Sequence, residues 1–129
     1  MKLVLQRAIG DCGIAALATL LEQTYEDVYV ASAKTDHRAR GKSGITTAGM
    51  IHTAKLLGVR LVEKRQPALD EDDGILVIRW RRPQQHPFSA HLVVLTNGVI
   101  VDPAEGWFGP HDEYLARFQA TTGALLETA

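Results

Sequence analysis

The 129-residue chain lacks several features that would define its class. Its single cysteine, Cys12, excludes an intramolecular disulfide and favours a reduced, cytoplasmic protein. Fourteen Lys and Arg face fifteen Asp and Glu, and this balance argues against a nucleic-acid-binding protein, which normally carries a basic excess. No apolar run reaches the roughly 18 residues of a membrane span, and residues 1–6 are too short for a signal peptide. These absences indicate a small soluble protein whose residues 1–129 form one domain.

The first half of the chain predicts helices. A lead-in or short strand is expected at residues 2–6, helices at 11–22, 25–33 and 46–57, and a polar loop at 34–44. Helix 11–22 is apolar on nearly every face, which is typical of a helix buried at the centre of a domain. Gly10 or Asp11 would be its N-cap, and Thr46 or Thr47 that of the third helix.

The second half predicts strands. Short runs rich in Val, Ile and Leu lie at residues 59–63, 75–80, 91–95 and 99–101, and a final helix is expected at 112–121. Asn97-Gly98 predicts a hairpin with a type I′ turn between the last two strands. Helices followed by strands indicate an α+β fold in which N-terminal helices pack on a C-terminal antiparallel sheet.

Cys12 lies at the start of the predicted central helix, where unpaired backbone N–H groups and the helix dipole stabilise a thiolate. The thiolate is the nucleophilic form of cysteine. Gly13 follows directly and leaves room for a substrate backbone near the sulfur. The alternative is that Cys12 is a small buried apolar residue, which is the usual role of a free cysteine.

The predicted hairpin brings a histidine and an aspartate together. With Asn97-Gly98 as the turn, Thr96 pairs with Val99, Leu95 with Ile100, Val94 with Val101 and Val93 with Asp102. His91 then lies on the same face as Asp102 and diagonal to it, within reach of an imidazole–carboxylate contact. Such an aspartate orients a catalytic histidine. The alternatives are a core histidine and a strand-ending turn.

Gln6 lies six residues before Cys12, across a short loop that contains Gly10. Its amide could donate to a developing oxyanion, with the Cys12 backbone N–H as the second donor. Trp107 and Phe108 follow the aspartate in a glycine-flanked loop, where they line a substrate groove or cover the core.

The residues from Gln6 to Ala18, QRAIGDCGIAALA, resemble the nucleophile segment of the bacteriocin-processing, double-glycine-leader cysteine peptidases. Residues 44–58, 91–95 and 101–103 resemble the family's next helix, its histidine strand and its aspartate turn. The resemblance implies a papain-like fold, with Cys12 as nucleophile and His91 as acid and base. It also implies that Asp102 is the orienting residue and Gln6 the oxyanion donor.

Other motifs are weaker. The sequence Gly41-Lys42-Ser43 lacks the earlier glycine of a phosphate-binding loop. Arg79, Arg81 and Arg82 surround Trp80 and are interpreted as the solvated end of a strand, and the acidic stretch at 70–73 as an exposed turn. His37, His52, His86 and His111 have no metal-ligand spacing. We therefore expect no metal and no cofactor.

The leading hypothesis is a cysteine peptidase that acts on a peptide or protein substrate, after a small residue such as glycine. A triad-bearing amidase, deamidase or transpeptidase is the second hypothesis, and a non-catalytic peptide-binding module of the same fold is the third. Without transmembrane helices or a nucleotide-binding domain, the chain matches a free-standing peptidase domain rather than a complete exporter. The natural substrate, the oligomeric state and the host, a bacterium or a virus, stay open.

Overall fold

A computed structural model of the chain describes residues 2–7, 11–35, 46–81 and 90–129. The helices in these ranges are α1 (Cys12–Leu21), α2 (Tyr25–Thr35), α3 (Thr47–Leu56) and α4 (His111–Arg117). The strands are β1 (Leu61–Lys64), β2 (Gly74–Trp80), β3 (Ala90–Thr96), β4 (Val99–Asp102), β5 (Trp107–Pro110) and β6 (Ala120–Thr128). The predicted α+β class is confirmed.

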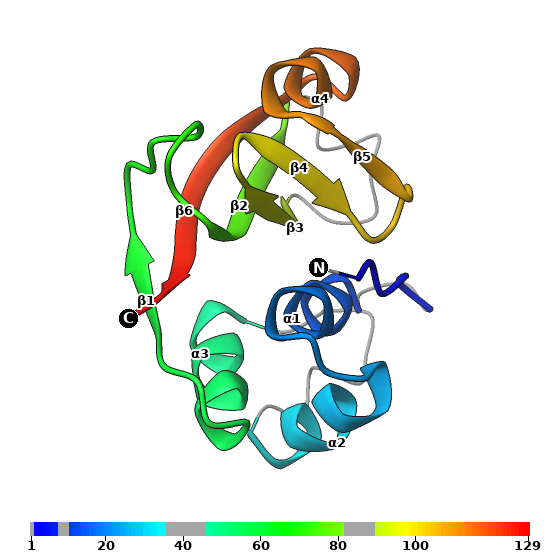
Figure 1. Cartoon of the computed structure of the whole chain (residues 1–129), viewed down its shortest axis with the longest axis vertical. Helices are drawn as coiled ribbons and strands as arrows, with labels where there is room; N and C mark the ends of the chain where they lie inside the picture. Colours follow the sequence, from blue (N-terminus) through cyan, green and yellow to red (C-terminus); the bar gives the residue numbers. More distant parts are fainter. Residues whose placement is uncertain (1, 8–10, 36–45, 82–89) are drawn as a thin grey trace.

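The described strands form one antiparallel sheet in the order β1-β6-β2-β3-β4-β5. Helices α1, α2 and α3 gather on one side of the sheet, with α1 nearest to it, while α4 lies at the far end (Figure 1). Because side chains alternate along a strand, each face of the sheet has its own apolar core. Val94 and Val101 pack toward the helical layer, whereas Val93 and Ile100 pack toward α4.

Helix α1 is the buried centre of the helical layer, as its apolar sequence predicts. Its residues 13–19 are all buried. The hydroxyl of Thr19 donates to the Ala15 carbonyl oxygen at 2.8 Å and accepts from the Val4 N–H at 3.0 Å. The lead-in, which forms no strand in residues 2–7, is thereby attached to α1.

The β3–β4 hairpin forms in the predicted register. Thr96 pairs with Val99, Leu95 with Ile100 and Val94 with Val101. Asn97 and Gly98 have φ angles of 52° and 76°, in the left-handed region that a type I′ turn requires.

The prediction for the C-terminal region is wrong in part. The helix expected at 112–121 ends at Arg117, and residues 120–128 form β6, which lies between β1 and β2. Gln119, with a φ of 49°, leads from the helix into this strand. The sequence of β6 contains threonines but no valine, isoleucine or aromatic residue, and its Gly123 lies against β2 where the β2–β6 register shifts. Non-local pairing, rather than local propensity, makes this segment a strand.

Several boundaries also differ from the prediction. Helix α2 continues to Thr35, past the predicted end at 33, and β1 covers 61–64 rather than 59–63. Strand β5 was not predicted. The expected cap of α3 is present, because the Thr46 hydroxyl accepts from the Gly49 N–H at 2.9 Å. Residues 36–44 of the predicted loop lie outside the described residues.

Candidate active site

The hairpin brings His91 and Asp102 into direct contact. The distance between His91 Nε2 and Asp102 Oδ1 is 2.8 Å. The His91 side chain is 11% exposed and that of Asp102 is fully buried. The predicted contact between the two side chains is therefore present, in a setting that largely excludes water.

Asp102 accepts several hydrogen bonds at the end of β4. Besides His91, its Oδ1 accepts from the backbone N–H of Ala104 at 2.8 Å and of Glu105 at 3.4 Å, which closes the turn after the strand. Its Oδ2 accepts from the hydroxyl of Tyr114, on α4, at 2.5 Å. The carboxylate is thus held by its own turn, by a neighbouring strand and by a helix.

His91 has two further neighbours. The indole of Trp80, at the end of β2, stacks on the imidazole with ring centroids 5.7 Å apart and an angle of 20° between the planes. The side chain of Cys12 lies close enough to the imidazole to raise the pKa of His91. His91 therefore joins the sheet to the start of α1.

The charges of these groups follow from their contacts. Burial by itself would lower the pKa of His91, but its hydrogen bonds to Asp102 and Cys12 and their charges outweigh burial and raise the pKa to about 10. Burial opposes ionisation of Asp102 as well, yet the hydrogen bonds and charge of His91, together with Tyr114 and the Ala104 N–H, lower its pKa. An imidazolium and a carboxylate consequently face each other at neutral pH.

Cys12 is the first residue of α1 and is half-buried. Its position at a helix N-terminus was predicted, and the buried Gly13 follows in the first turn. Asp11 is the N-cap residue, but its side chain makes no capping hydrogen bond to the helix.

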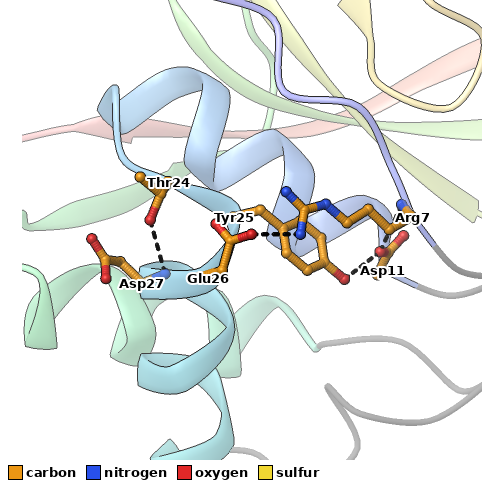
Figure 2. Close-up of polar contacts among 6 residues, drawn as sticks. All are labelled: Arg7, Asp11, Thr24, Tyr25, Glu26 and Asp27. Atoms are coloured by element: carbon orange, nitrogen blue, oxygen red, sulfur yellow. Dashed lines mark hydrogen bonds and ion pairs between the residues drawn. The ribbon is translucent and has the colours of Figure 1, made fainter.

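The Asp11 carboxylate instead faces α2, as Figure 2 shows. Its Oδ2 accepts from the hydroxyl of Tyr25 at 2.6 Å and from the backbone N–H of Arg7 at 3.0 Å. The Arg7 guanidinium lies 4.2 Å from the centroid of the Tyr25 ring and pairs with Glu26 at 2.6 Å. These contacts attach Arg7 and Asp11, which both precede Cys12, to α2. The sequence did not reveal this role of Asp11.

Gln6, in the lead-in, is hydrogen-bonded to the turn that follows β4. Its backbone N–H donates to the carbonyl oxygen of Pro103 at 3.0 Å, directly after Asp102, and its side-chain Oε1 is buried. The lead-in that precedes the nucleophile segment is thereby attached to the turn that carries the aspartate.

Trp107 packs in the core on the α4 face of the sheet. Its ring meets those of Tyr114 and Phe118 edge-on, with centroids 6.2 and 5.9 Å apart. These contacts belong to the core, and the substrate-binding role of Trp107 stays a prediction. Phe108, its neighbour in β5, is 68% exposed.

Within the part of the chain that the structure describes, the remaining motifs form no metal centre. In the described ranges, no three His, Cys, Asp or Glu side chains cluster as metal ligands would. None of the described helices has the length and apolar character needed to cross a bilayer. His111 pairs with Asp70 at 2.8 Å. The sequence Gly41-Lys42-Ser43 lies outside the described residues, as do Arg82, His37 and His86.

Two residues of the site were not predicted as partners of His91 and Asp102. Tyr114 lies within the segment 112–121 that was expected to be helical, but its contact with Asp102 depends on how α4 packs against the sheet. Trp80 was interpreted only with the neighbouring arginines. Its place diagonal to His91 follows from the β2–β3 register, in which Ile78 pairs with His91. Neither contact is encoded in local sequence spacing.

The fold is shared with a protease of known structure. No family model matches the chain, and no curated protein matches it by sequence. Among solved structures, the chain is similar to a double-glycine motif protease from an AMS/PCAT transporter, crystallised in complex with the leader peptide. The TM-score is 0.63 at 22% sequence identity, over 98% of this chain and 89% of that one. At this identity the likeness shows the fold.

Proposed function

We propose that this protein is a cysteine peptidase, with Cys12 as the nucleophile, His91 as the general acid and base, and Asp102 as the residue that orients His91. One observation carries the proposal: the imidazole of His91 is hydrogen-bonded to the buried Asp102 and also interacts with the side chain of Cys12, the one cysteine of the chain. A nucleophile, a base and an orienting carboxylate in this order of contact are the parts that acyl transfer needs.

The proposed reaction begins with a protonated His91 beside the sulfur of Cys12. Because the pKa of His91 is raised to about 10, the imidazole is protonated at neutral pH and stabilises negative charge on the sulfur beside it. The sulfur of Cys12 attacks the scissile carbonyl carbon. Since His91 Nε2 is held by Asp102, Nδ1 is the nitrogen that we propose exchanges protons with the sulfur and the leaving amine.

His91 then gives its proton to the leaving amine, and the acyl group stays on Cys12 as a thioester. Water attacks the thioester while His91 takes up a proton, which releases the carboxylic acid and the free thiolate. We propose that the oxyanion of both steps is bound by the Gln6 side-chain amide and the backbone N–H of Cys12. First-turn N–H groups have no partner within a helix and are available for such a role.

The proposed substrate is a peptide with small residues before the scissile bond. Gly13, which is buried in the first turn of α1, adds no side chain beside the nucleophile and so leaves room for a substrate backbone at Cys12. The solved structure that shares the fold is a double-glycine motif protease in complex with the leader peptide. A cleavage site after glycine is therefore the first to test.

The test is to incubate the protein with peptides that contain Gly-Gly, Gly-Ala or bulky pairs, in water enriched in ¹⁸O. The control is Cys12→Ala, and mass spectrometry identifies the products. A peptidase produces new termini that depend on Cys12, and the new carboxylate carries one ¹⁸O from water.

The other hypotheses give different products. A transpeptidase joins the acyl part to an added amine without ¹⁸O, and an amidase or deamidase converts an amide group while leaving the chain uncut. A binding module retains peptides without altering them, equally in wild type and Cys12→Ala. Cleavage that is absent, or that persists in Cys12→Ala, would contradict the proposal.

A further inference from the structure

A buried tyrosine on α4 contacts the carboxylate that faces His91. Tyr114 is fully buried, and its hydroxyl donates to Asp102 Oδ2 at 2.5 Å. We propose that Tyr114 is a positioning residue. It holds the Asp102 carboxylate in the orientation in which Oδ1 contacts His91, and α4 thereby becomes part of the active site. This inference rests on the proposed function.

The hydrogen bonds of Asp102 divide between its two oxygens. Oδ1 accepts from His91 and from the N–H groups of Ala104 and Glu105, whereas Oδ2 accepts from Tyr114. A donor on each oxygen fixes the plane of a carboxylate. Without the tyrosine, Oδ2 would be a buried, charged acceptor that has lost its donor, and rotation toward another donor would weaken the contact with His91.

The tyrosine hydroxyl is itself held in place by packing. The Tyr114 ring lies 4.6 Å from Phe118 and 6.2 Å from Trp107, measured between ring centroids. These aromatic contacts do not involve the hydroxyl, so a phenylalanine can keep them. Burial and the negative charge of Asp102 raise the pKa of Tyr114, and the hydroxyl therefore remains a donor at every pH at which the protein works.

The substitution Tyr114→Phe is the first test, with Tyr29→Phe as the matched control. Tyr29 lies on α2, stacked on Tyr25 rather than against Asp102. NMR of ¹⁵N-histidine-labelled protein reports the titration of His91 without any substrate. If Tyr114 positions Asp102, His91 titrates at a lower pH in Tyr114→Phe than in wild type and is unaffected in Tyr29→Phe.

Kinetics provide the second readout. Loss of one hydrogen bond to a charged group should lower kcat by about ten- to a hundredfold and leave KM nearly unchanged, because the hydroxyl does not touch the substrate. In an Asp102→Ala background the same substitution should have no further effect, since the carboxylate through which it acts is gone.

The outcomes distinguish the positioning role of Tyr114 from the proposed peptidase function. A His91 pKa that is unchanged or raised in a folded Tyr114→Phe protein would overturn the positioning role, even where peptide cleavage is established. A lowered pKa in a protein that cleaves no peptide would support the positioning role and refute the peptidase function. If Tyr114→Phe does not fold, ¹³C-tyrosine-labelled wild type replaces it. A downfield-shifted hydroxyl proton of Tyr114 that disappears in Asp102→Asn then supports the contact with Asp102. A wild-type spectrum without such a proton overturns the positioning role.

Discussion

The raised pKa of His91 predicts how stability depends on pH. A group whose pKa is higher in the folded state stabilises the fold. This stabilisation is complete at a pH below the unfolded pKa, near 6.5, and is lost as the pH rises toward the folded pKa of about 10. Across this window the folded protein holds one proton more on His91 than the unfolded chain does. The free energy of unfolding should therefore fall by about 1.4 kcal/mol per pH unit from this group.

The measurement is cleanest in a Cys12→Ala background, because an unfolded thiol titrates within the same window and its protons would offset those of His91. Asp102 contributes more than Cys12 to the rise in the pKa of His91, so much of the effect survives there. Between pH 6.5 and 8.5 we expect this protein to lose about 1–2 kcal/mol that the double variant Cys12→Ala/His91→Gln does not lose.

Urea unfolding followed by the fluorescence of Trp80 and Trp107 provides the assay, at half-unit pH steps. The difference between the two variants should be greatest at the acid end of the window and shrink as the pH rises. Curves that run parallel from pH 6.5 to 8.5 would refute the reasoning, because His91 would then have no raised pKa in the folded state.

Further substitutions test separate parts of the account. Asp102→Asn should lower kcat by about 10³- to 10⁴-fold in a peptide-cleavage assay, with an unchanged kcat counting against the orienting role. Gln6→Ala should lower kcat by about 10²- to 10³-fold at similar KM, and a change in KM alone would point to substrate binding instead. Thr46→Ala removes the cap of α3 and should cost about 1 kcal/mol in urea unfolding while the reactivity of Cys12 stays the same. Gly74→Ala should destabilise by more than about 2 kcal/mol, because a Cβ there would collide with the backbone of Leu126 in β6; a wild-type unfolding midpoint would contradict this.

The parts of the fold that were predicted are those that local chemistry determines. Asn97-Gly98 specified the turn, the turn specified the register of β3 and β4, and the register placed His91 beside Asp102. The small apolar residues of α1 likewise specified a buried helix that begins at Cys12. In each case the residues that determine the structure lie within one or two adjacent elements.

The parts that were not predicted depend on contacts between distant elements. Strand β6 is a strand because it fills the space between β1 and β2, not because of its own propensity. Tyr114 reaches Asp102 only after α4 has packed on the sheet, and Asp11 reaches Tyr25 only after α2 has packed on α1. Sequence spacing alone carries no information about these distances.

The central claim, that Cys12 is a nucleophile activated by His91, is tested most directly by the rate at which iodoacetamide alkylates the one cysteine of the chain. At pH 7 the folded protein should react faster than the same protein unfolded in urea, although folding half-buries the sulfur. His91→Ala should abolish that advantage. A folded protein that reacts more slowly than the unfolded chain, with or without His91, would show that folding merely protects Cys12 and would contradict the account.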